Sequence, residues 1–198
     1  MMMNDIGNKI AEFAEKTKLQ IVFLEPGKDH WILCDKSDRK TIAGFLKKQG
    51  FKGKRSAFRN DKYLYGTDPF MKFEKAGQSV VLVCQIACRS TLHGEWVPLD
   101  RKINLDALQR IRRDQAGIPL LSYEDELCYL LAKGVYTEKA FSEDCRKRIG
   151  LCMKHVQRDV LLPKLEGVFF CFTEKMLVLL EQERYEDIIP ALWRFAEY

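Results

Sequence analysis

The 198-residue sequence has no long apolar run. Runs such as Val80–Cys84 and Val168–Phe172 are far shorter than the roughly 20 residues of a membrane-spanning helix. Residues 1–18 carry three acidic side chains and lack the apolar core of a signal peptide. No low-complexity stretch is present, and 46% hydrophobic residues are ample for a packed core. These absences predict a soluble, cytoplasmic, folded protein without a membrane span.

Several common catalytic signatures are also missing. The sequence contains no Gly-x-Ser-x-Gly, no Gly-rich phosphate loop and no Gly-x-Gly-x-x-Gly. Its seven cysteines are odd in number and scattered among apolar stretches, which is typical of reduced thiols and not of a disulfide framework. The one close pair, Cys84 and Cys88, lacks the second pair that completes most zinc sites.

What the sequence does have is an uneven distribution of positive charge. Residues 1–100 hold 17 Lys and Arg against 12 Asp and Glu, whereas residues 101–198 hold 16 of each. The excess is concentrated in a basic strip that consists of Lys47, Lys48, Lys52, Lys54, Arg55, Arg59 and Lys62. Two interpretations are open: a surface that faces phosphates or nucleic acid, and an ordinary solvated helix end and hairpin.

Hydrophobic spacing in the first half predicts an α+β domain. The expected elements are a helix over 4–16, strands over 19–24 and 30–34, a helix that ends at Gly50, and strands over 54–65, 71–74 and 79–87. Because Val80–Cys84 is apolar at every position, that strand is expected to be covered on both faces.

The second half has helical spacing almost throughout. We expect a short helix over 105–113, a helix that begins at Ser122 and stops at Gly134, a long helix from 137 to Pro163, and a last helix from 185 onward. For 168–180 we expect a helix, with a short strand as the alternative. The change of class near residue 104 predicts two domains, an α+β domain over 1–104 and an all-α helical domain over 105–198.

This order of elements resembles the nucleotidyltransferase superfamily. The likeness is to a bacterial branch in which a Leu-Ser-x-Glu-Asp segment opens the helical part, here Leu121-Ser122-Tyr123-Glu124-Asp125. It covers about residues 15–160. The resemblance implies a mixed sheet with flanking helices, a helical C-terminal bundle, and a cleft between the halves for a nucleotide, nucleotide-sugar or other phosphorylated ligand. It also implies a place in surface-polysaccharide biosynthesis.

The family's metal site is incomplete in this chain. Enzymes of the superfamily hold two Mg²⁺ ions on three carboxylates, which neutralise the triphosphate and activate the attacking hydroxyl. Asp29 matches the first acid, but Trp31 stands at the second, and the strand Val80–Cys84 offers no third. Glu25-Pro26-Gly27 replaces the Gly-Ser step. The resemblance therefore implies that the usual chemistry is lost and that Mg²⁺ is a cofactor only if transfer is retained.

Two aspartates just beyond the second strand allow another interpretation. Asp35 and Asp38 are residue types that cap a helix, and they are also candidate substitute ligands. An active transferase with a displaced metal site would require Asp29, Asp35 and Glu95 to converge in space, because paired metals lie only about 4 Å apart.

The segment from Cys88 to Trp96 gathers several reactive side chains in one loop. Arg89 is suited to hold a phosphate or carboxylate, with Ser90 beside it, and His93 or Glu95 is suited to transfer a proton. Trp96 is suited to stack on a base or sugar. The alternative is that this loop simply packs onto the core.

Two hypotheses about function follow from these patterns. The first is a nucleotidyltransferase-like protein that binds a phosphorylated ligand, with Asp29, His93 and Glu95 as catalytic candidates and with Arg89, Ser90, Trp96, Lys54, Arg55 and Arg59 as binding candidates. The second is a non-catalytic interaction module that docks its basic strip onto nucleic acid or an acidic protein. The sequence does not indicate an oligomeric state.

Overall fold

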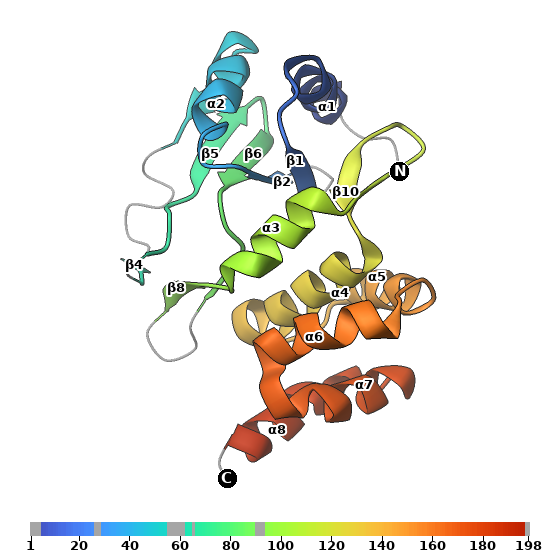
Figure 1. Cartoon of the computed structure of the whole chain (residues 1–198). Coiled ribbons are helices and arrows are strands. Elements are labelled where there is room, and N and C mark those ends of the chain that lie inside the picture. The colour runs from blue at the N-terminus through green and yellow to red at the C-terminus, as the bar shows by residue number, and fades with distance from the viewer. Residues whose placement is uncertain (1–4, 26–28, 55–61, 65, 90–93, 197–198) are drawn as a thin grey trace. The chain divides into compact units, whose positions relative to one another are not determined.

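The computed structural model describes residues 5–25, 29–54, 62–64, 66–89 and 94–196. The chain divides into two compact units, one of residues 1–87 with 94–122 and the other of residues 88–93 with 123–198. Strands and helices share the first unit, and the described part of the second is almost entirely helical (Figure 1). The expected α+β class is confirmed. None of the described helices is long and apolar enough to cross a bilayer.

A mixed sheet of seven strands is the centre of the first unit. In spatial order its strands are β3 (Lys52–Gly53), β5 (Met71–Lys75), β6 (Gln78–Val83), β2 (Asp29–Cys34), β1 (Ile21–Glu25), β10 (Pro119–Leu121) and β9 (Ile111–Arg113). β2 runs parallel to β6 and β1 runs parallel to β10, whereas the other neighbouring pairs are antiparallel. The β1–β2 hairpin therefore sits in the middle of the sheet.

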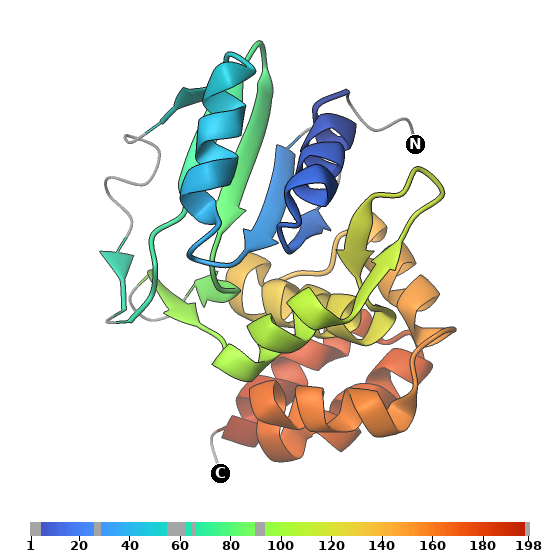
Figure 2. The ribbon, with the colours of Figure 1, turned by 45° about the horizontal axis from the view of Figure 1, so that its top comes forward.

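Two helices cover one face of this sheet. α1 (Asp5–Thr17) and α2 (Arg39–Lys48) bury their apolar residues in one core cluster with alternate residues of β1, β2 and β6 (Figure 2). Phe13 stacks on Phe45 with ring centroids 4.2 Å apart and joins the two helices. α3 (Arg101–Gln109) contacts β1 and β2. Val80 to Val83 are all buried, so the expected coverage of this strand on both faces is confirmed.

A second, smaller sheet contains β4 (Lys62–Tyr63), β7 (Ala87–Arg89) and β8 (Glu95–Pro98). β4 pairs in parallel with β8, and β7 precedes β8 in the chain. The strand predicted over 54–65 is wrong in extent, because only Lys62–Tyr63 is extended within the described part of that range. Residues 55–61 lie outside the described residues.

The second unit is a set of packed helices. In chain order these are α4 (Tyr123–Ala132), the π-helix η2 (Lys133–Glu138), α5 (Glu143–Met153), α6 (Arg158–Phe169), the 3₁₀ turn η3 (Phe170–Phe172), α7 (Thr173–Glu181) and α8 (Tyr185–Ala196). α5 and α6 both pack on α4, which is buried over most of its length.

Two helix predictions are wrong for physical reasons. The long helix expected over 137–163 is broken between Met153 and Arg158, where Gln157 donates its backbone N–H to Glu124 Oε1 at 2.9 Å. The apolar spacing continues across this break because α5 and α6 bury their faces against the same helix. The helix expected over 105–113 ends at Gln109, since the chain then enters β9 and pairs with β10.

Candidate functional site

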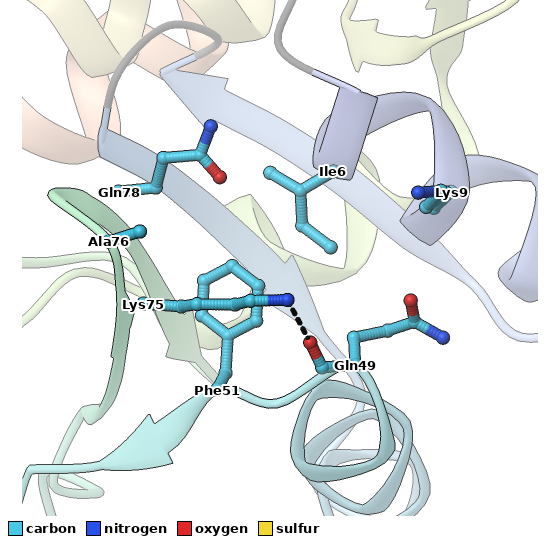
Figure 3. Close-up of a pocket in the computed structure, with 7 residues that line it drawn as sticks. All are labelled: Ile6, Lys9, Gln49, Phe51, Lys75, Ala76 and Gln78. Atoms are coloured by element: carbon cyan, nitrogen blue, oxygen red, sulfur yellow. Dashed lines mark hydrogen bonds between the residues drawn. The ribbon is translucent and has the colours of Figure 1, made fainter.

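A pocket of about 170 Å³ lies in the first unit. Three parts of the chain form it: the start of α1, the end of α2 and the hairpin between β5 and β6 (Figure 3). Its lining residues are Ile6, Lys9, Gln49, Phe51, Lys75, Ala76 and Gln78. Two of these side chains carry ammonium groups and two carry amides, so most of the polar groups are hydrogen-bond donors.

The end of α2 sets one wall of the pocket. Gly50 has a φ of 85°, and its N–H bonds to the Lys47 carbonyl while the Phe51 N–H bonds to the Leu46 carbonyl, at 2.9 and 3.0 Å. This is the Schellman arrangement, which requires a left-handed residue after the helix. It confirms that Gly50 terminates α2, whose last helical residue is Lys48, and it places Phe51 in the core and on the pocket wall.

The β5–β6 hairpin sets the opposite wall. Lys75 pairs with Gln78 across a two-residue turn in which Ala76 and Gly77 have φ values of 46° and 77°. Lys75 Nζ donates to the Gln49 carbonyl at 2.6 Å and lies 6.0 Å from the centroid of the Phe51 ring. The side chain crosses the ring toward Gln49 (Figure 3). The ammonium group is therefore held in place by a backbone carbonyl.

The charge around this pocket is positive. Among the described residues no carboxylate lies within ion-pair distance of Lys75. Lys9 contributes a second ammonium to the lining, and Lys47 and Lys48 are exposed on the last turn of α2. At about 30 Å³ for each water, the volume corresponds to roughly six waters. A phosphate group fits in this volume, and the rest of a larger ligand would lie outside the pocket.

Substituting Gly50 tests this geometry. We expect Gly50→Ala to lower the free energy of unfolding by about 1–2 kcal/mol, because the left-handed backbone penalises a Cβ. That Cβ would also lie 3.4 Å from Lys75 Nζ. Gly44→Ala is the matched control within α2, since its Cβ would meet nothing within 4 Å and should stabilise the helix. Urea unfolding followed by circular dichroism measures the stability of both variants. Equal changes in the free energy of unfolding would contradict the left-handed conformation of Gly50.

Asp29 lies at the same end of the sheet but outside the pocket lining. It is the first residue of β2, pairs with Ser79 and accepts a hydrogen bond from Ser79 Oγ at 2.6 Å. The next residue, His30, is buried, and burial lowers its pKa against the opposing effect of Asp29. Asp29 is thus a surface carboxylate already engaged by a hydroxyl.

Trp31 belongs to an aromatic cluster. Its ring packs edge-on against Phe70 at 5.4 Å, and Phe70 contacts Tyr63 at 5.8 Å and Trp96 at 4.9 Å. The indole of Trp31 is thus engaged in packing. The predicted role of Trp96 in stacking on a ligand stays a prediction, with its ring in contact with Phe70.

The candidate carboxylates do not all converge. Asp29 begins β2 and Asp35 directly follows its last residue, six positions later, so at about 3.3 Å per residue they lie roughly 20 Å apart. Asp35 Oδ1 accepts hydrogen bonds from the Ser37 N–H and hydroxyl, which lower its pKa. Asp38 is the N-cap residue of α2 but makes no side-chain cap bond. Glu95 lies in the separate strand β8. Among the described residues, no cluster of three His, Cys, Asp or Glu is placed to hold a metal ion.

The remaining predicted residues are dispersed. Lys54 pairs with Glu74 at 3.0 Å, and hydrogen bonds from Lys72 and Lys54 lower the pKa of Glu74. Arg89 lies in the second unit, where its backbone N–H donates to Thr137 Oγ1 at 3.1 Å. The predictions for Arg55, Arg59, Ser90 and His93 lie outside the described residues.

The structure is similar in fold to two solved nucleotidyltransferases. The lincosamide antibiotic adenylyltransferase LnuA, bound to lincomycin, is 12% identical with a TM-score of 0.46, and the match covers 76% of this chain and 97% of that one. The antibiotic-resistance factor ANT(2'')-Ia is 10% identical with a TM-score of 0.47, over 90% and 94% of the two chains. No protein-family model and no curated protein matches. The likeness concerns the fold alone.

Sequence patterns did not point to the pocket itself. Lys75-Ala76-Gly77 was expected only as a turn, and Gly50 only as a helix end. Lys9 lies in a helix that reads as an ordinary amphipathic one. The one sequence feature that could have indicated the pocket was the basic strip, because Lys47 and Lys48 lie in the last turn of α2, next to the pocket wall.

Proposed function

We propose that this chain binds the phosphate group of a nucleotide, nucleotide-sugar or other phosphorylated ligand in the lysine-lined pocket, and that it does so without two-metal transfer chemistry. One observation carries the proposal. Lys75 is held by the Gln49 carbonyl at 2.6 Å, and among the described residues no carboxylate neutralises it.

The donor count supports an anionic ligand. A lysine ammonium has three N–H donors, and the Gln49 carbonyl takes one of them. Phosphate oxygens accept such bonds strongly because both partners are charged. The side chains of Lys9 and Gln78 also line the pocket. The surrounding lysines raise the local concentration of anions.

The residues present do not fit the metal pair of the superfamily. The Trp31 ring is packed against Phe70, and Asp35 is roughly 20 Å along β2 from Asp29. Asp29 alone, hydrogen-bonded to Ser79, does not form a carboxylate cluster. Binding is therefore expected to be independent of Mg²⁺.

Thermal unfolding with ligand tests the proposal. ATP and a uridine diphosphate sugar, each with and without Mg²⁺, are expected to raise the midpoint by several degrees at 100 times the dissociation constant, which corresponds to about 2.7 kcal/mol. Lys75→Gln should remove most of this shift. Lys40→Gln, an exposed lysine on the first turn of α2, should retain it.

Other outcomes of this screen overturn parts of the proposal. An equal shift in Lys75→Gln and wild type would place the ligand elsewhere. The second unit has an open groove of about 520 Å³ between α7 and α8, where Arg184 is paired with Asp187 at 2.7 Å. Loss of the shift in Lys175→Gln instead would assign binding to that groove. A shift that requires Mg²⁺ would contradict the loss of metal chemistry.

The exposed lysines of the basic strip favour a second candidate function. Lys47, Lys48 and Lys52 are exposed and have no carboxylate partner among the described residues. They suit a module that docks on nucleic acid or an acidic protein. Binding of a DNA oligonucleotide that falls steeply between about 50 and 200 mM salt, and that Lys75→Gln leaves unchanged, would support it over the pocket.

A further inference from the structure

Two thiols meet at the end of the sheet where β2 and β6 finish. Cys34 is the last residue of β2, and Cys84 directly follows β6. The strands are parallel and Leu33 pairs with Val83, so the next residue of each strand lies beside the other. Adjacent strands are about 4.8 Å apart, which falls within the range of Cα separations that a disulfide spans.

The two side chains point to the same side of the sheet. Cys34 belongs to the core cluster beneath α1 and α2, and Cys84 packs against that cluster. Cys34 Sγ donates to the carbonyl of Val83, the residue before Cys84, at 3.7 Å, and each thiol shifts the pKa of the other. Cys34 is fully buried and Cys84 is partly exposed. One thiol of the pair is therefore open to a small oxidant, and the other is held directly behind it.

We propose that Cys84 and Cys34 are a redox modification site, in which hydrogen peroxide converts the two thiols into a reversible disulfide. The site lies at the opposite end of β6 from Gln78, so it is separate from the proposed phosphate pocket.

The chemistry balances with peroxide as the only oxidant. The Cys84 thiolate attacks one peroxide oxygen, the O–O bond breaks, and Cys84 becomes a sulfenic acid while the departing hydroxide is protonated to water. Cys34 sulfur then attacks the sulfur of Cys84 and displaces its hydroxyl group, which takes the Cys34 proton and leaves as the second water. Two thiols are oxidised and one peroxide is reduced to two waters.

The surroundings favour Cys84 as the attacking thiol. The Cys34 thiol lowers the pKa of Cys84, burial opposes this, and the Arg39 guanidinium lowers it further. Asp68 and Lys36 act in opposite senses. By contrast, burial raises the pKa of Cys88 and of Cys128 to about 12. The thiolate is the form of a cysteine that attacks peroxide.

Peptide mapping after peroxide treatment tests the site. The folded protein is treated with hydrogen peroxide, its free thiols are alkylated after unfolding, and the peptides are analysed without reduction. We expect a linked peptide that joins Cys34 and Cys84 and disappears after dithiothreitol. Cys34→Val should stop at a sulfenic acid on Cys84 that dimedone captures. Cys171→Ser, which removes an exposed cysteine, should form the same link as wild type.

The results that would overturn the proposal are equally specific. They are the absence of the linked peptide when Cys171 is fully oxidised, or a disulfide that joins Cys84 to another cysteine. If Cys34→Val does not fold, Cys84→Ser replaces it, and the proposal then requires that Cys34 stay unoxidised. Because this readout is covalent, it is unaffected by whether phosphorylated ligands bind.

Discussion

Lys164→Met is expected to lower the free energy of unfolding by about 3–5 kcal/mol. Lys164 Nζ lies 2.6 Å from Asp125 Oδ1, and only 7% and 1% of the two side chains are exposed. The pair joins α6 to α4 inside the second unit. Removing the ammonium leaves a buried carboxylate without its counter-ion, which costs more than the pair itself contributes. Urea unfolding at neutral pH, followed by circular dichroism, measures the loss.

Two further variants separate this effect from the loss of a long side chain. Asp125→Leu combined with Lys164→Met should recover most of the stability, because an apolar pair has no charge to desolvate. Lys147→Met removes an exposed pair with Glu143, whose side chains are 67% and 82% exposed, and should cost well under about 1 kcal/mol. If Lys164→Met costs no more than Lys147→Met, the buried pair does not stabilise the unit as described.

Gly134→Ala is expected to destabilise the second unit by about 3 kcal/mol, at the upper end for overpacking. A Cβ at Gly134 would collide with Cε1 of Phe141 and lie 2.7 Å from Cδ1. Phe141 is buried, so its ring has little room to move. Differential scanning calorimetry should show a clear fall in the unfolding midpoint.

The control for this substitution is another helical glycine. Gly150 lies in α5, and a Cβ there would meet nothing within 4 Å, so Gly150→Ala should stabilise by about 0.5–1 kcal/mol. Phe141→Leu in the Gly134→Ala background should recover part of the loss by making room. Similar midpoints for Gly134→Ala and Gly150→Ala would contradict the close contact.

Local signals in the sequence predicted the first unit well. The turn residues 25–27, with an apolar run on either side, predicted the β1–β2 hairpin, and Gly50 predicted the end of α2. Both predictions succeeded because a hairpin and a helix end depend on residues that are neighbours in the sequence. Gly134 was expected to stop a helix, but the chain continues through it as a π-helix. The glycine is required by Phe141 packing from seven positions later, which a helix-stop signal does not reveal.

Long-range contacts explain what the sequence did not predict. Asp125 lies in the first turn of the helix that is predicted to begin at Ser122, but its burial against Lys164, 39 positions away, has no local signal. In the same way, Lys75 donates a hydrogen bond to the Gln49 carbonyl, 26 positions away in the sequence. The residues around Lys75 and Gln49 form no sequence motif that indicates a ligand site. The packing of Trp31 against Phe70, 39 positions away, likewise required the structure.

The central claim is that a phosphorylated ligand binds beside Lys75, and a titration followed by amide NMR tests it most directly. ATP without Mg²⁺, added to ¹⁵N-labelled protein, should shift the amide signals of residues 49–51 and 75–79 and leave those of α4 to α8 unchanged. The same titration of Lys75→Gln should give no shifts at these positions. Shifts confined to Arg89 and the second unit, or shifts that persist in Lys75→Gln, would contradict the proposal.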